Sequence, residues 1–259
     1  MLAADSRVTL TAQRVDSNIL LPAFFDNATK LLKVEGQDFV AAITYGLGAL
    51  GQTAPRTASS FLPEFETELK KANASRLSVE EFATKLGEFF KRQWDAAGMP
   101  PESSDQMIFL IGGYDEGAPY GRVFEVNVPL AIKPAEKNPG DSFGVIWGGQ
   151  LQTATRLLNG FDPQLPKVVQ EYLGLGPERQ ADIRQHLMEN LGLPIPYQFL
   201  PLQDCIDLAI LLVRTTAQLQ TFMVDIRGVG GDIDVATITR TRGFHAVQQK
   251  EIRGEQFEF

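Results

Sequence analysis

The residue types that most often carry nucleophilic or metal-dependent chemistry are scarce in this sequence of 259 residues. It has one cysteine, Cys205, and two histidines, His186 and His245. Cys205 lies among apolar residues, which is typical of a buried, unreactive thiol. A single cysteine excludes an intramolecular disulfide and a multi-cysteine zinc site. Neither histidine belongs to a cysteine–histidine zinc motif, so we expect no metal site.

A glycine-rich segment near the C-terminus superficially suggests a phosphate-binding loop. It reads Arg227-Gly-Val-Gly-Gly231 and leads into the alternating apolar residues Ile233, Val235 and Ile238. That alternation predicts a strand, so no helix N-terminus follows the glycines to bind a phosphate. The sequence also has no Gly-Lys-Ser/Thr phosphate loop. We therefore expect no nucleotide cofactor, and no cofactor of any other kind.

Composition and charge limit the class of protein. The net charge is -8 and the pI is about 4.9, which argues against sequence-independent nucleic-acid binding, because phosphate affinity needs a concentrated basic face. The hydrophobic fraction of 44% is enough for one substantial core. There is no signal-peptide pattern and no apolar run near the roughly 18 residues of a membrane span. These features predict a single-domain cytoplasmic protein with no membrane or nucleic-acid partner.

The apolar pattern predicts strands, then two helices, and then further strands and helices before a final strand pair. The predicted strands cover residues 1–10, 39–45, 106–112, 121–128, 143–147, 233–238 and 244–247. The predicted helices cover residues 57–72, 78–97, 151–158, 167–173, 178–191 and 204–222. Residues 11–29 and 129–141 are expected to be irregular connections. This order favours antiparallel sheets with helices outside them, an α+β fold.

Two of the predicted helices carry a further signal. Ser78 followed by Glu81 forms a capping box at the start of the second helix. The helix predicted at 204–222 is apolar nearly all round, so we expect it to be covered on both sides, inside the protein or against a neighbouring subunit.

Several segments, in order, carry a family resemblance. They are Leu2-Ala-Ala-Asp-Ser-Arg-Val-Thr9, Thr29-Lys-Leu-Leu-Lys-Val34, the strand that ends at Gly46, Leu110-Ile-Gly-Gly-Tyr-Asp-Glu116 and Gly230-Gly-Asp-Ile-Asp-Val-Ala-Thr-Ile238. Together they resemble the β-subunit of the proteasome core particle and its bacterial relatives, of the N-terminal-nucleophile (Ntn) hydrolase superfamily. The resemblance implies a four-layer α-β-β-α sandwich, with two antiparallel sheets between helical layers. It implies one domain over residues 1–259, with a helical insertion at about 165–192.

The resemblance also implies a catalytic site. Members of this family hydrolyse peptide bonds with an N-terminal threonine, a weak nucleophile that an adjacent base must activate. By resemblance, Asp5 is the supporting carboxylate, Lys30 is the active-site lysine, and a backbone N–H near Gly46 is the oxyanion donor. Lys33 is an alternative for the active-site lysine. We prefer Lys30, because Lys30 directly precedes the Leu31-Leu32 pair as in the family. Without the family pattern, Asp5 and Lys30 would be read as a structural ion pair or as two solvated charges.

Three departures from the family pattern accompany this resemblance. The family's nucleophile lies on a strand before the position of Asp5, and no residue of this sequence is assigned that role, so we expect the first strand and its nucleophile to be missing from the chain. Thr9 and Thr11 are read as ordinary strand threonines. Gly148 stands where the family has a serine. In Asp225-Ile-Arg-Gly-Val-Gly-Gly231, Val229 replaces another serine and one residue is extra, so Asp225 is a weaker counterpart of the family's aspartate.

Three functions therefore stay open. The first is a threonine-type endopeptidase that assembles into a ring with itself or related subunits and cleaves peptides or unfolded proteins. The second is a non-catalytic structural or assembly subunit of the same fold, which Gly148 and Val229 favour. The third is an Ntn amidohydrolase of small amides, because a fold alone does not exclude it.

Overall fold

The computed structural model describes residues 1–13, 20–51, 54–138 and 142–251. Its strands are β1 Leu2–Ala4, β2 Val8–Gln13, β3 Leu20–Phe25, β4 Leu31–Leu32, β5 Val40–Gly46, β6 Ala49–Leu50, β7 Arg56–Thr57, β8 Met107–Gly113, β9 Arg122–Val128, β10 Ala131–Glu136, β11 Asp234–Thr239 and β12 Gly243–Gln248. Its α-helices are α1 Leu62–Lys71, α2 Val79–Ala96, α3 Leu151–Asn159, α4 Leu165–Tyr172, α5 Arg179–Leu191 and α6 Leu202–Gln220. The protein is thus α+β, with antiparallel sheets.

The largest sheet has the strand order β10-β9-β8-β5-β4. Because side chains alternate along a strand, one face of this sheet presents apolar residues such as Ala42, Phe109 and Val126 to the main core. Helix α2 covers that face. Its buried residues, Phe82, Leu86 and Phe89 among them, recur at helical spacing and form the apolar stripe that packs on the strands.

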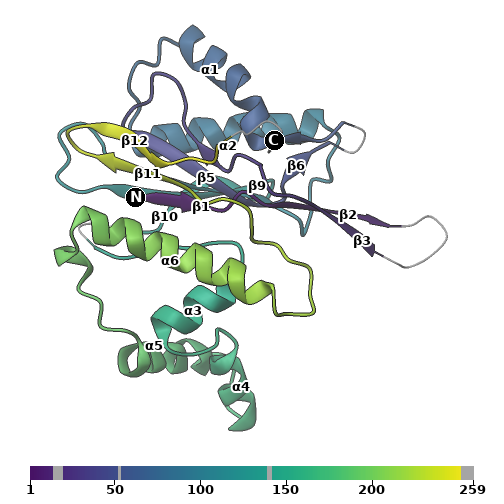
Figure 1. Cartoon of the computed structure of the whole chain (residues 1–259), viewed down its shortest axis with the longest axis vertical. Helices are drawn as coiled ribbons and strands as arrows, with labels where there is room; N and C mark the ends of the chain where they lie inside the picture. Colours follow the sequence, from purple (N-terminus) through teal and green to yellow (C-terminus); the bar gives the residue numbers. More distant parts are fainter. Residues whose placement is uncertain (14–19, 52–53, 139–141, 252–259) are drawn as a thin grey trace, which may run out of the picture.

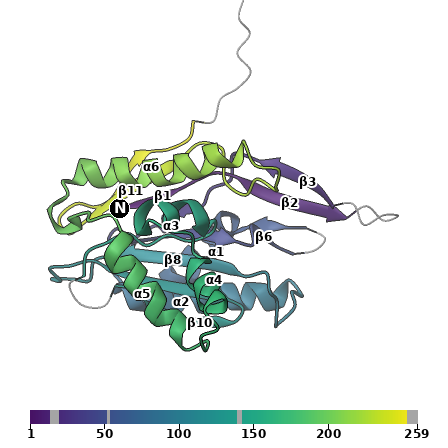
Figure 2. The same ribbon diagram turned by 90° about the horizontal axis from the view of Figure 1, so that it is seen from below.

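A second sheet, β1-β11-β12, lies against the opposite face of the first. Leu2 of β1 reaches across to Gly112 of β8, where an added Cβ would lie 3.6 Å from it. Helix α6 covers the outer face of this second sheet, with Ile206 packed in a cluster that includes Val235 of β11. Figure 2 shows α6, then β1 and β11, then β8, then α2 stacked in that order.

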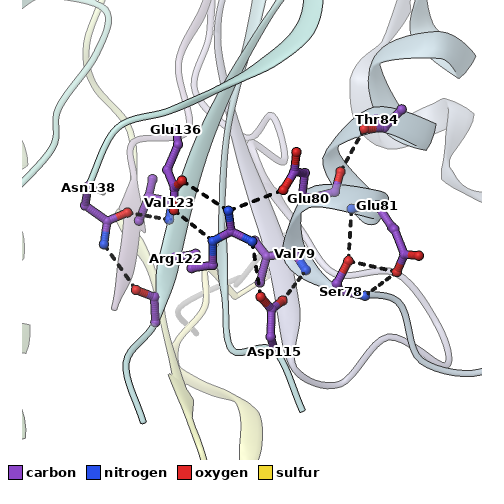
Figure 3. Close-up of polar contacts among 11 residues, drawn as sticks. Ser78, Val79, Glu80, Glu81, Thr84, Asp115, Arg122, Val123, Glu136 and Asn138 are labelled. Carbon is purple, nitrogen blue, oxygen red and sulfur yellow. Dashed lines mark hydrogen bonds and ion pairs between the residues drawn. The ribbon is translucent and has the colours of Figure 1, made fainter. Parts of the chain in front are cut away.

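The start of α2 is tied to the large sheet by polar contacts (Figure 3). The predicted capping box is confirmed, since Ser78 Oγ accepts from the Glu81 N–H at 3.2 Å and Glu81 accepts from the Ser78 N–H at 3.0 Å. Asp115 accepts from the Val79 N–H at 2.7 Å and from Arg122 at 3.3 Å. These contacts fix the position of the N-terminus of α2 relative to the strands.

Gly87 allows α2 to approach β9 and β10 closely. A Cβ there would lie 2.8 Å from both the Ile132 carbonyl oxygen and Val126 Cγ1. A helical glycine replaced by alanine ordinarily gains about 1 kcal/mol, but overpacking a tight contact costs about 1–3 kcal/mol. We therefore expect Gly87→Ala to lower the free energy of unfolding in urea titrations. Glu88→Ala, at the exposed neighbouring position, should change that free energy by less than about 0.5 kcal/mol; a stabilised Gly87→Ala protein would contradict this packing.

Three local predictions were wrong. The expected connection 11–29 contains β2 and β3, which pair as a hairpin and extend away from the sheets (Figure 1); residues 14–19 lie outside the described part. The expected loop 129–141 contains β10, an edge strand, where a proline such as Pro134 is tolerated; residues 139–141 are not described. The expected strand 143–147 has no regular structure, because Val145 and Trp147 pack on α3 and α6 instead of pairing with a strand.

Helix α6 departs from its predicted environment. One face is covered, with Ile206, Leu212 and Thr216 buried, but Leu211 and Leu219 are exposed. The expectation that α6 is covered on both sides inside this chain was therefore wrong, and cover by a neighbouring subunit stays a prediction. Residues 165–192 form α4 and α5, which lie at one end of the molecule beside α3 (Figure 1). No described helix is long and apolar enough to cross a membrane.

Candidate active site

Asp5 and Lys30, predicted from the resemblance to act together, do meet. Lys30 Nζ lies 2.7 Å from Asp5 Oδ1, and the two side chains are only 15% and 12% exposed. At this separation the two charged groups form a direct ion pair. Among the earlier alternatives, two independent solvated charges are therefore excluded, whereas a purely structural ion pair is not.

Asp5 lies in the short irregular segment that separates β1 from β2. Its second oxygen, Oδ2, accepts from the Arg7 N–H at 3.1 Å and from the Gly230 N–H at 3.0 Å. Ser6 also joins the two segments, because its N–H donates to the Gly230 carbonyl at 3.1 Å and its hydroxyl to the Asp232 carbonyl at 2.6 Å. The glycine-rich segment before β11 therefore holds the carboxylate that faces Lys30.

Lys30 immediately precedes β4, and its carbonyl accepts the Thr44 N–H of β5 at 3.0 Å. The competitor Lys33 lies elsewhere: its Nζ is 2.8 Å from Asp38, a largely exposed carboxylate. Lys30, and not Lys33, is therefore the lysine that contacts Asp5.

Among the described residues, the Gly46 N–H at the end of β5 has no hydrogen-bond acceptor in the strand pairing, and it lies on the Lys30 side of that strand. The Leu47 N–H bonds to the Gln106 carbonyl at 2.7 Å, so the preceding pair, Gly46 and Met107, exchanges no hydrogen bonds with β8, because bonded pairs alternate in an antiparallel ladder. The Gly46 N–H therefore points away from β8, on the same side of β5 as the Thr44 N–H. β4 offers it no acceptor, because its pairing with β5 ends at the Lys30 carbonyl.

These groups border one cavity of about 300 Å³. Besides Asp5, Lys30 and Gly46, its lining includes Arg7, Thr9, Thr29, Thr44, Tyr45, Thr57, Gly148, Gly149, Gln150, Gly228 and Val229. Both positions at which the sequence departs from the family, Gly148 and Val229, are in this lining. A Cβ at Gly148 would lie 2.2 Å from the Tyr45 ring, so the ring occupies the space that a serine would need.

Asp225 is not brought to the site. It is exposed, accepts from the neighbouring Ile226 N–H at 2.7 Å, and does not line the cavity. The group of this segment that reaches Asp5 is instead the Gly230 N–H, which donates to Asp5 Oδ2 at 3.0 Å. Cys205 is half-buried and also lies outside the cavity lining.

Two features of the site were missed by sequence reasoning. Arg7 lies on the cavity wall and its Nε is 2.6 Å from Asp26, whose pKa this hydrogen bond lowers. Asp26 belonged to a segment expected to be irregular, so no pattern identified the pair. The Thr44 hydroxyl is buried with no hydrogen-bond partner among the described residues, and only the strand register could have placed it at the cavity.

The cavity offers several hydroxyl groups but no assigned nucleophile. The Thr9 hydroxyl donates to the Arg227 carbonyl at 3.0 Å, and that of Thr57 lies 3.1 Å from Ser59 Oγ. Within the described ranges, no threonine hydroxyl hydrogen-bonds to Lys30 or Asp5. The pair and Gly46 can therefore supply a charge relay and an oxyanion donor, but the attacking group is not among their contacts.

The glycines at 46, 48 and 51 have the spacing of a dinucleotide-binding fingerprint, which requires a following helix. Here Ala49 and Leu50 form strand β6, so this spacing does not indicate a dinucleotide-binding site.

In comparisons with known proteins, no family model matches the sequence and no curated protein matches it.

Proposed function

We propose that this chain is a proteasome-like subunit whose cavity serves the hydrolysis of peptide bonds by a threonine-type mechanism. The observation that carries the proposal is the 2.7 Å pair of Asp5 and Lys30 in the cavity that Gly46 also lines. The stacking of α2, two antiparallel sheets and α6 (Figure 2) supports the finer proposal that the fold is the four-layer Ntn sandwich.

Each group has a definite role in this mechanism. Lys30, held by Asp5, relays the proton of a hydroxyl nucleophile, since such a nucleophile is weak without an adjacent base. The Gly46 N–H donates to the oxygen on which negative charge develops in the transition state. The nucleophile is by resemblance an N-terminal threonine, and we assign it to no described residue. Partner copies or related subunits would complete a ring and could cover the exposed side of α6.

A second candidate is a non-catalytic subunit that keeps the fold and the ion pair. Gly148 and Val229 favour it, because no hydroxyl replaces the two serines at these places in the cavity lining. In that case the Asp5–Lys30 pair would serve only to join β4 to the turn after β1.

Measurements on the mature protein, purified from its native source, distinguish the two candidate functions. Its N-terminal sequence and intact mass are determined first, and hydrolysis of short fluorogenic peptides is then measured on the same sample. We expect hydrolysis, with a hydroxyl or thiol residue at the mature N-terminus. A mature chain that begins at Met1 and cleaves none of the peptides would refute the peptidase and leave the non-catalytic subunit.

A further inference from the structure

A second cavity, of about 460 Å³, adjoins the candidate active site at Tyr45. Tyr45 lines both cavities. Much of the wall of the second cavity is apolar, with Trp147 from the segment before α3, Leu151 from α3 and Phe161 just beyond that helix. The volume lies within the roughly 300–1,000 Å³ typical of small-ligand sites. Its walls therefore suit an apolar group.

The polar groups on one side of the cavity neutralise one another. The Tyr45 hydroxyl donates to Glu125 at 3.1 Å, and Lys137 pairs with the other oxygen of Glu125 at 3.3 Å. Burial, followed by the nearby Glu125 carboxylate, raises the pKa of Tyr45 above its ordinary value, so the phenol stays protonated and remains a donor. This group of three leaves no charge for a ligand to satisfy.

Two other lining side chains are unpaired. Arg184 of α5 is exposed to solvent and forms no ion pair or hydrogen bond within the part of the chain that the structure describes. Asn159 at the end of α3 is only 8% exposed, and its amide likewise has no partner among the described residues. A guanidinium binds carboxylates bidentately, and an amide can donate to the same group. The cavity thus has an apolar wall and a single uncompensated positive charge.

We propose that this cavity binds an apolar group that ends in a carboxylate, with the apolar body against Trp147 and Phe161 and the carboxylate on Arg184. The C-terminal residues of an apolar peptide and a free aromatic or aliphatic acid share this chemistry. The proposal does not rest on peptide hydrolysis, because a ligand can occupy this cavity whether or not the Asp5–Lys30 site is active.

Binding is tested on the full chain with three probes: N-acetyl-Leu-Phe as the free acid, the same dipeptide as its C-terminal amide, and 3-phenylpropanoate. Calorimetry gives the affinities, and tryptophan fluorescence gives the location, because Trp147 lines the cavity while Trp94 is fully buried in the main core. We expect the dipeptide acid to bind about tenfold or more tightly than its amide, as a charge-assisted hydrogen bond requires. Tighter binding of the dipeptide acid than of 3-phenylpropanoate would identify a peptide end, and the reverse order a small acid.

The variant Arg184→Gln should reduce the affinity for the acid to that for the amide and leave the amide unchanged. The matched control is Arg179→Gln, on the same helix, because Arg179 is exposed, pairs with Asp182 at 3.0 Å and does not line the cavity. Equal binding of acid and amide, an unchanged affinity in Arg184→Gln, or no binding at millimolar concentrations would overturn the proposal. None of these outcomes depends on whether the protein hydrolyses peptides.

Discussion

Replacing Lys30 by alanine is expected to lower the rate of peptide hydrolysis about 10²–10⁴-fold, the range for loss of a positioned proton-transfer group. The reason is that Lys30 Nζ, which Asp5 holds at 2.7 Å, is the proposed proton relay in the cavity that Gly46 also lines. The measurement is kcat/KM on a fluorogenic peptide, with the urea unfolding midpoint recorded for each variant. A folded Lys30→Ala protein that keeps its activity would exclude Lys30 from the mechanism.

Lys33→Ala is the matched control. It also breaks a lysine–aspartate pair, Lys33 with Asp38 at 2.8 Å, but this pair is more exposed and lies outside the cavity lining. Exposed pairs contribute about 0–1 kcal/mol, so Lys33→Ala should keep both the activity and nearly all of the stability. If the two lysine variants lost activity equally, the loss would reflect a general change in charge or folding and not the candidate site.

Replacing Gly46 by alanine is expected to lower peptide hydrolysis about 10²–10³-fold, as for loss of one oxyanion donor. Gly46 has a φ of 82°, and its added Cβ would lie 2.3 Å from the Gln106 carbonyl oxygen. The backbone must therefore shift, and the shift moves the N–H that faces the cavity. The same kinetic assay and urea titration measure both effects.

Gly36→Ala separates this local displacement from simple backbone strain. Gly36 has nearly the same φ, 80°, but nothing lies within 4 Å of its added Cβ. It should therefore show only the cost of a left-handed conformation, about 1–2 kcal/mol, and keep full activity. Equal activities of the Gly46→Ala and Gly36→Ala proteins would show that the Gly46 N–H has no role in hydrolysis.

The regular elements that sequence could predict are those with long periodic patterns. Helix α2 has apolar residues at helical spacing and a capping box, and it begins at Val79, directly after the predicted cap Ser78. By contrast, β10 and the β2–β3 hairpin are short, contain proline and owe their existence to pairing with another strand. Such pairing is a property of the fold and leaves little periodicity in the local sequence.

The candidate site divides in the same way. Asp5, Lys30 and Gly46 were predicted because the sequence around them resembles a family, and the strands bring Asp5 and Lys30 together across 25 positions. Asp225 was expected at the site but lies outside the cavity lining, because the Gly230 N–H is the group of that segment that contacts Asp5. Tyr45 went unnoticed, since both the two cavities that it lines and its hydrogen bond to Glu125, 80 positions away, form only in the folded chain. Contacts of that range require the folded chain.

In the proposed mechanism, the Asp5–Lys30 pair activates a nucleophile in the cavity that Gly46 lines. The most direct test treats the mature protein with a peptide vinyl sulfone, measures the intact mass and maps the modified residue. We expect one adduct per chain, on a hydroxyl or thiol, formed at the normal rate in Lys33→Ala and lost in Lys30→Ala. Absence of an adduct in the wild type, or equal labelling of the Lys30→Ala protein, would contradict the account.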